Sequence, residues 1–287
     1  MGIMQRKGLT IINAVALLLY SPLSVAQKET IYWHTFHRPP SSIKTGDMVG
    51  KGFLDRVTYQ LIKAMPNYSH FEPMSSPKRT ESAMRDGKKV CHPVYLKNKE
   101  RSKFAYFSKP SVVAPSIRLV GLSVPDGLET EKVRLEELDK DSTFVFHRGR
   151  AHNETIDGFI KNLPDERKMV LSTNKTKELF KLVALGKIDY TFSYPIEVNY
   201  FNQQHSAQNL TSWQVKDVQQ YVVGYVACSK SPWGKDVIEQ VNLALAKLAG
   251  SKSYWHAMTS WWPEEVERQE FIDFHEANFL QKHRQNN

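Results

Sequence analysis

Two stretches of the chain alternate strand-like and helix-like patterns, and this alternation limits the possible folds more than any other feature. In the first stretch, strand patterns at 30–33, 68–74 and 90–95 alternate with a helix between Gly52 and Pro66 and a shorter helix at 79–86. Strands joined by helices in this order are typical of an α/β layer with a parallel sheet.

A second stretch repeats the alternation. Its patterns are strands 143–146, 169–172 and 189–194 and helices 154–163 and 175–185. Two extended apolar segments, 116–123 and 221–228, connect the stretches, and a helix with an apolar row follows at 235–248. The patterns therefore predict an α/β protein with two units joined by two extended crossings.

Residues 1–26 have the arrangement of a cleavable export signal. Arg6 and Lys7 precede an apolar run at 9–19, and small residues lead up to Ala26. The run is shorter than the roughly 20 apolar residues of a membrane-spanning helix. Because Gln27 rather than cysteine follows Ala26, no lipid anchor is expected there. We expect a periplasmic or secreted mature protein.

The charge of the chain is concentrated in one segment. Lysine and arginine total 39 against 30 acidic residues, a formal charge of +9. Two of these charges lie in the export signal, and segment 78–109 holds ten basic and three acidic residues. Nucleic-acid binders carry their charge on a recognisable module, and none is present here, so no nucleic-acid partner is expected.

Sequence fingerprints of metal sites and common enzymes are missing. The ten histidines and two cysteines show no metal-ligand spacing. Phosphate-binding loops, dinucleotide fingerprints and nucleophile elbows are also absent from the sequence. We therefore expect no metal, no cofactor and no catalytic residue of these classes.

Several short motifs follow one another in a specific order. They are Pro39-Pro40, Gly50-x-Gly52-x-x-Asp55, Glu100-Arg101, Phe107-Ser108-Lys109-Pro110, Leu185-Gly186-Lys187-Ile188-Asp189 and Gln219-Gln220-Tyr221. With these motifs the chain resembles the bacterial periplasmic solute-binding proteins of family 3, the amino-acid-type receptors of ABC importers. The resemblance implies a two-lobed clamshell without a cofactor. Lobe one would comprise 27–122 and 224–287, and lobe two 123–223.

In lobe one, the resemblance implies a ligand-binding role for Arg101. Its planar guanidinium suits a carboxylate, to which it can donate two parallel hydrogen bonds. Tyr95 and Leu96, on the loop before it, match positions that offer backbone groups to the ligand. An aromatic residue after the first strand should also line the cleft. The candidates in that loop are Trp33 and Phe36, with His37 and Arg38 beside them.

In lobe two, the resemblance places Arg148 at a helix N-terminus, where backbone N–H groups can meet an anion. Amino-acid receptors of this family carry an acidic residue just after the strand that begins here at Asp189, and this residue pairs with the ammonium group of the ligand. That position falls on Ser193 or Tyr194. Glu197 either replaces the acid or is simply a charge on the next helix. This departure from the family pattern argues against an ordinary α-amino acid as the ligand, whereas Arg101 and Arg148 are compatible with a carboxylate-bearing or otherwise anionic compound.

Cys91 and Cys228 form an even pair in an exported chain, which favours a disulfide. Cys91 lies on the third strand and Cys228 at the end of the second crossing. In the fold that the resemblance implies, these strands can be neighbours. The alternative is two buried thiols that act as small apolar side chains.

Three functions remain open at this point. The first is a monomeric receptor that delivers a small ligand to the membrane permease of an ABC importer. The second is a ligand sensor that docks on a membrane signalling receptor. The third is a dehydratase-like enzyme on the same fold, which would need a general acid or base in the cleft. His147 and Glu197 are the candidates for that role.

Overall fold

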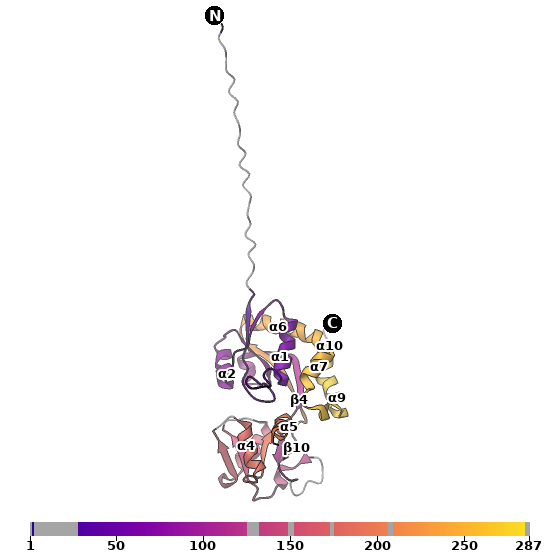
Figure 1. The fold of residues 1–287 in the computed structure, drawn as a ribbon. Coiled ribbons are helices and arrows are strands. Elements are labelled where there is room, and N and C mark those ends of the chain that lie inside the picture. The colour runs from indigo at the N-terminus through magenta and orange to yellow at the C-terminus, as the bar shows by residue number, and fades with distance from the viewer. Residues whose placement is uncertain are drawn as a thin grey trace.

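The computed structural model describes residues 28–124, 132–148, 152–172, 175–205 and 209–284, together with Gly2. Apart from Gly2, the expected export signal lies outside these residues. The chain forms two α/β lobes, one above the other in Figure 1, and the C-terminal helices lie beside the upper lobe. The two-lobed α/β architecture expected from the sequence is confirmed.

The first lobe is built on a five-stranded sheet with the order β2-β1-β3-β11-β4. These strands are β1 (Thr30–Trp33), β2 (Ser69–Phe71), β3 (Val90–Tyr95), β4 (Ala105–Pro115) and β11 (Tyr221–Ser229). Strands β2 and β3 run parallel to β1, whereas β11 runs antiparallel to both β3 and β4. The expected parallel sheet is therefore mixed, because β11 enters from the second lobe in the opposite direction.

Helices cover this sheet and bury its apolar side chains. They are α1 (Phe53–Ala64), α2 (Pro77–Arg85), α6 (Pro232–Leu248) and α7 (Lys252–Thr259). Helix α1 begins after Gly52, whose N–H donates to Asp55 over 3.2 Å. A Cβ on Gly52 would lie 2.5 Å from the Ser41 carbonyl oxygen, so only glycine fits. The start of α1 is thereby tied to the loop that follows β1.

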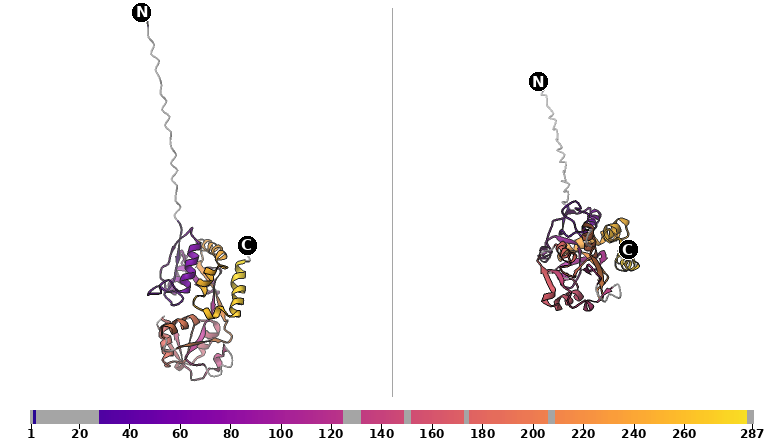
Figure 2. Two further views of the ribbon diagram at one scale, coloured as in Figure 1. Left: turned by 45° about the vertical axis from the view of Figure 1, so that its right-hand side comes forward. Right: turned by 60° about the horizontal axis from the view of Figure 1, so that its bottom comes forward.

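The C-terminal region adds elements for which the sequence suggested no pattern. Helices α8 (Pro263–Val266) and α9 (Gln269–His275), a π-helical turn (Glu276–Leu280) and α10 (Gln281–Arg284) run beside the first lobe in Figures 1 and 2. Phe271, His275, Phe279 and His283 form a ladder of ring contacts at four-residue spacing. His283 bonds the Pro110 carbonyl over 2.8 Å, which anchors the ladder to β4.

The second lobe holds a four-stranded sheet, order β6-β10-β5-β9, and a parallel pair, β7-β8. The strands are β5 (Arg118–Gly121), β6 (Lys132–Val133), β7 (Phe144–His147), β8 (Lys168–Leu171), β9 (Thr191–Ser193) and β10 (Thr211–Val215). The helices are α3 (Glu154–Asn162), α4 (Thr176–Ala184) and α5 (Pro195–Gln204). A bridge between Phe144 and Tyr190 joins the two sets of strands.

The chain crosses between the sheets at points that differ from the expected lobe boundaries. Strand β4 ends at Pro115, opposite Tyr221, and the Ser116 N–H donates to the Gln220 carbonyl over 2.9 Å. Strand β5 pairs with β10 and β9 of the second lobe, so 118–121 belong to the second sheet and not to lobe one. Conversely, 221–223 pair in the first sheet. The crossings are therefore shorter than the apolar segments, because both segments include residues paired within a sheet.

The Cys91–Cys228 disulfide is present. The two residues occupy directly opposite positions of β3 and β11, with their Cα atoms 4.0 Å apart, and both are fully buried. In the part of the chain that the structure describes, no helix is both long and apolar enough to cross a membrane.

Candidate functional site

The loop between β1 and α1 faces the second lobe and is held by a buried carboxylate. Asp55 accepts hydrogen bonds from the Ser42 hydroxyl and the Ile43 N–H, each over 2.7 Å, and pairs with Lys44 over 2.9 Å. Backbone hydrogen bonds of 2.8 and 2.9 Å join Arg38 and Ser42. Asp55 therefore fixes the part of the loop that positions Arg38.

Arg38 and Glu197 form an ion pair between the lobes. The Arg38 Nε donates to Glu197 Oε1 over 2.7 Å, and the guanidinium lies 5.6 Å from the centre of the Tyr194 ring. Glu197 stands in the first turn of α5, where it also accepts from the Ser193 hydroxyl and, over 3.4 Å, from the Tyr194 N–H. A side chain of the first lobe, Arg38, thus meets a side chain of the second lobe, Glu197, at the carboxyl ends of β1 and β9.

This ion pair is desolvated on the carboxylate side. The Glu197 side chain is 1% exposed and that of Arg38 29% exposed. Burial alone would lower the pKa of Arg38, but the charge of Glu197 and the hydrogen bond to it raise that pKa above its ordinary value. Arg38 therefore stays charged, and the pair is an electrostatic contact between the loop and α5.

Arg101 lies in a 3-10 turn (Arg101–Lys103) after β3 and stacks on Tyr95, with its guanidinium 4.1 Å from the ring centre. It donates to the Leu96 carbonyl over 2.9 Å, and its Nε lies 3.8 Å from Glu81. The Tyr95 hydroxyl donates to Glu81 over 2.5 Å. Arg101, Tyr95 and Leu96 thus lie together, and the Leu96 carbonyl, one of the backbone groups at these two positions, accepts a hydrogen bond from Arg101.

Phe36 lies beside this cluster, and Trp33 does not. The Phe36 ring is 5.9 Å from that of His92, which in turn is 5.3 Å from the Tyr95 ring. Burial is the main cause that lowers the pKa of His92 to about 4, so the ring is neutral near neutral pH. Trp33 is fully buried in the first-lobe core and donates to His70 over 3.0 Å. The expectation that Trp33 contacts a ligand is wrong, because the ring has no accessible surface.

In the second lobe, Tyr194 and Glu197 lie at the interface with Arg38. Arg148 is exposed on the turn after β7, with its N–H bonded to the Leu171 carbonyl over 2.9 Å. Residues 149–151, which follow it, lie outside the described residues. His147, the other candidate acid or base, is buried at the end of β7. The structure thus groups Tyr194 and Glu197 with Arg38, and Arg101, Tyr95 and Leu96 with Phe36.

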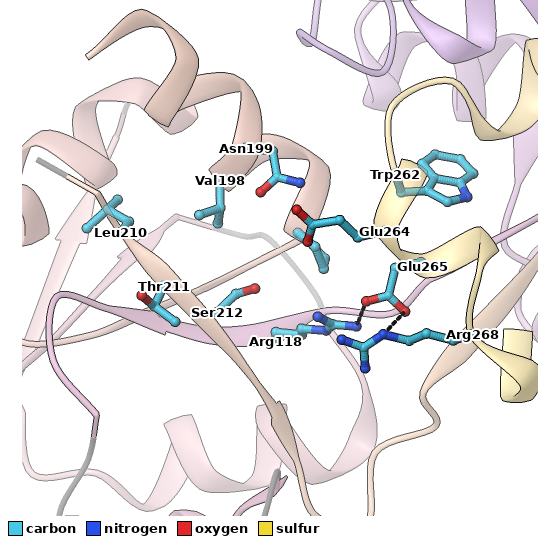
Figure 3. A pocket seen from close by; sticks show the side chains of 11 residues that line it. Arg118, Val198, Asn199, Leu210, Thr211, Ser212, Trp262, Glu264, Glu265 and Arg268 are labelled. Carbon is cyan, nitrogen blue, oxygen red and sulfur yellow. Dashed lines mark hydrogen bonds and ion pairs between the residues drawn. The ribbon is translucent and has the colours of Figure 1, made fainter. Parts of the chain in front are cut away.

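A separate cavity of about 250 Å³ lies beside the crossings between the lobes (Figure 3). It is lined by residues from α5, β10, β5 and the C-terminal region: Arg118, Pro195, Val198, Asn199, Leu210, Thr211, Ser212, Trp262, Glu264, Glu265 and Arg268. None of the ligand-binding candidates from the sequence lines it. Within the described residues, no group of three or more His, Cys, Asp or Glu side chains could hold a metal ion.

The sequence did not single out Arg38 as the partner of Glu197. It named Arg38 only as a neighbour of the candidate aromatic residues in the first loop. The two residues are separated by 159 positions, so no local pattern links them. The opposite charges of the two residues could have suggested the pair. Glu197 follows strand β9 and Arg38 follows strand β1, and both strand ends were expected at the cleft.

No known protein family and no curated protein matches the sequence. Several solved protein structures, however, are similar to the structure of this chain. One is a probable amino-acid ABC transporter extracellular-binding protein, ytmK from Bacillus subtilis, with a TM-score of 0.64, 17% identity and coverage of 83% of this chain and 100% of that one. A histidine kinase sensor domain similar to periplasmic binding proteins matches with a TM-score of 0.63 at 14% identity, over 83% and 97% of the two chains.

A third similar structure comes from work on glutathione import through GshT and the cystine ABC importer TcyBC of Streptococcus mutans. Its TM-score is 0.63 at 19% identity, and the match covers 82% of this chain and 95% of that one. At these identities the similarity establishes the fold. The chain has the two-lobed periplasmic-binding-protein fold, and its structural neighbours are importer receptors and sensor domains. This agrees with the resemblance to family 3.

Proposed function

We propose that this protein is an exported solute-binding protein that captures a small, carboxylate-bearing ligand between its lobes and delivers it to the permease of an ABC importer. The observation that carries the proposal is the Arg38–Glu197 pair, which places a charged group from each lobe at the carboxyl ends of β1 and β9. In open α/β sheets, ligands bind outside the carboxyl ends of the strands. Such a site lies where closure of the lobes would enclose a solute.

Arg101 is the proposed carboxylate-binding residue. Tyr95 supports its guanidinium from one face and Glu81 approaches its Nε, so the side chain is held in place before a ligand arrives. Preorganised groups lose less conformational entropy on binding. Phe36 would add apolar contact area from lobe one. Arg148 and Tyr194 would contribute from lobe two, while Glu197 orients Arg38.

A ligand screen tests the proposal directly. We would measure thermal unfolding of the protein with amino acids, dicarboxylates, polyamines and small peptides. A ligand at 100 times its Kd adds about 2.7 kcal/mol of stability, enough for a clear rise in Tm. Arg101→Ala should abolish that rise, and Lys103→Ala should keep it because Lys103 is an exposed neighbour on the same turn. A full rise in Arg101→Ala would contradict the role of Arg101.

Lobe closure is the second requirement. Small-angle X-ray scattering should show a smaller radius of gyration once the stabilising compound is added, because hinge closure brings the lobes together. No stabilising compound in the whole screen, or binding without a change in shape, would count against a capture protein. Size-exclusion chromatography checks the expected monomer, and fractionation of expressing cells checks the expected export.

A sensor role is the second candidate, because a histidine kinase sensor domain is among the structures with the same fold. The two roles differ in what the protein contacts and in whether solute enters the cell. A receptor for an importer should be required for uptake of its radiolabelled ligand. A sensor should leave uptake unchanged and instead alter the output of a signalling receptor. Consumption of the ligand by purified protein would favour the enzyme alternative over both.

A further inference from the structure

Arg38 carries a buried donor that is not used within the described part of the chain. Its Nε is bonded to Glu197, but its Nη2 atom is buried and makes no hydrogen bond with any described residue. Buried polar groups in native proteins almost always have a partner, and an unpaired charged donor is particularly unfavourable. The Nη2 atom therefore calls for an acceptor from outside the described chain.

Glu197 holds the guanidinium in a fixed orientation. It binds the Nε edge of Arg38, while the Ser193 hydroxyl and the Tyr194 N–H bind the same carboxylate from the second lobe. The guanidinium is planar and presents its donors as a rigid fork. Because the ion pair with Glu197 holds the Nε edge, the other N–H donors of the guanidinium also have a fixed orientation. Arg38 is thus prepared to donate to a second acceptor.

The carboxylates beside the candidate residues are already engaged. Glu197 is bonded to Arg38 and Ser193, and Glu81 is bonded to Tyr95 and paired with Arg101. A ligand ammonium group would have to compete for these carboxylates with arginine and hydroxyl donors. A ligand acceptor would instead add a hydrogen bond to a donor that lacks one. The site therefore favours an acidic group over an amine.

We propose that Arg38 Nη2 binds an oxyanion of the ligand, a carboxylate or a phosphoryl group, and that the ligand carries no ammonium. The inference rests on the proposed function, since it assigns a ligand class to the same inter-lobe site. It makes Arg38 a ligand-binding residue in addition to Arg101. It also gives Glu197 a positioning role, which differs from the ammonium-binding role considered for it from the sequence.

Matched ligand pairs test the inference by isothermal titration calorimetry of the protein expressed from its full sequence. Succinate is compared with aspartate, and glutarate with glutamate, because each pair differs by one α-ammonium group. Inorganic phosphate and glycerol 3-phosphate form the second arm, which separates phosphoryl from carboxylate recognition. At least one oxyanion probe should bind, and the preferred dicarboxylate should bind at least tenfold tighter than its amino counterpart if the group is a carboxylate.

The double variant R38Q/E197Q removes both charges and leaves no unpaired carboxylate. It should lower the affinity for the preferred oxyanion at least tenfold. Arg134→Gln removes the same charge from an exposed ion pair in the second lobe and should keep the wild-type affinity. If the double variant does not fold, as judged by circular dichroism, Arg38→Lys replaces it. Lysine keeps the charge without the fork, and the same tenfold loss is expected.

Three results would overturn the inference: tighter binding of aspartate or glutamate than of succinate or glutarate, unchanged oxyanion affinity in the folded Arg38 variant, or no binding of any oxyanion probe. The thermal unfolding screen proposed above distinguishes a wrong ligand class from a wrong function. If an amine, amino acid or peptide stabilises the protein and oxyanions do not, the capture function stands and the ligand class is wrong. If nothing in either set binds, both proposals fail.

Discussion

Arg118 donates to Glu265 over 2.6 Å, and this hydrogen-bonded ion pair joins the first strand of the second lobe to a short helix near the C-terminus. Glu265 also accepts from the Tyr221 hydroxyl over 3.3 Å. Arg118 and Tyr221 stand next to the two crossings, one on each. A single buried carboxylate therefore contacts both places where the chain passes between the lobes, and Figure 3 shows it beside the cavity.

Glu265→Ala should destabilise the protein strongly. The Arg118 and Glu265 side chains are 10% and 7% exposed, so removal of the carboxylate leaves a buried guanidinium without its partner. Breaking a buried pair in this way typically costs about 3–5 kcal/mol. Urea unfolding should show a lower midpoint for Glu265→Ala than for Glu264→Ala, whose side chain is exposed. Equal midpoints would show that the pair does not stabilise the junction.

Reduction of the Cys91–Cys228 bond should also lower stability. The bond joins residues 137 positions apart and so restricts the unfolded chain over a long loop. Loss of such a bond typically costs about 2–5 kcal/mol. The urea midpoint should fall when dithiothreitol is added to the wild-type protein. A variant with alanine at both positions serves as the control, because reductant should not change its midpoint.

Acid should destabilise the C-terminal ladder. Burial is the main cause that lowers the pKa of His275 to about 4, and burial also lowers the pKa of His283. Between pH 6.5, near the pKa of an unfolded histidine, and pH 4, the unfolded chain binds more protons than the folded one. Stability therefore falls as the pH falls through this window, by up to about 3 kcal/mol for His275 alone.

The measurement is the free energy of unfolding at several pH values. His275→Phe keeps a ring in the ladder and removes the titrating group, so its stability should depend less steeply on pH between 4 and 6.5. A slope equal to that of the wild-type protein would assign the acid sensitivity to other groups, such as His92, whose pKa is also lowered.

Two glycines within helices should respond to alanine in opposite directions. A Cβ on Gly234, in the first turn of α6, would lie 1.9 Å from the Ser229 carbonyl oxygen. One on Gly158 in α3 would have no described atom within 4 Å apart from its chain neighbours and the backbone of its own helix. Gly234→Ala should therefore cost about 1–3 kcal/mol or more through overpacking. Gly158→Ala should stabilise by up to about 1 kcal/mol, because alanine favours the helix. Equal Tm changes would contradict this local packing.

Much of the fold could be predicted because its signals are local. Strand β3 has the predicted bounds, 90–95, and helix α1 lies between Gly52 and Pro66 as expected. Apolar periodicity and helix-breaking residues act over a few positions, so they can be recognised in a single sequence. The pairing of Cys91 with Cys228 could be predicted for another reason, because the sequence contains two cysteines and they can pair only with each other.

The site was less predictable because its contacts are distant in sequence. The Arg38–Glu197 pair depends on how two lobes face each other, which no local pattern encodes. Trp33 was mistaken for a cleft residue, although side chains alternate along a strand. Ile31 and Trp33 share the buried face of β1, and Tyr32 points outward. In the C-terminal ladder, two of the four rings are histidines, which do not register as apolar.

The position of β11 determines the order in which the polypeptide can fold. This strand lies between β3 and β4, so β4 has no neighbour in the first sheet until residues 221–229 have been synthesised. The strands β5 to β10 of the second lobe are consecutive in the chain and are available earlier. The second lobe can thus form before the first sheet is complete, because the strands of the first 115 residues need β11. Until Cys228 has been synthesised, Cys91 has no disulfide partner within the chain, and its thiol can react with thiols of other molecules.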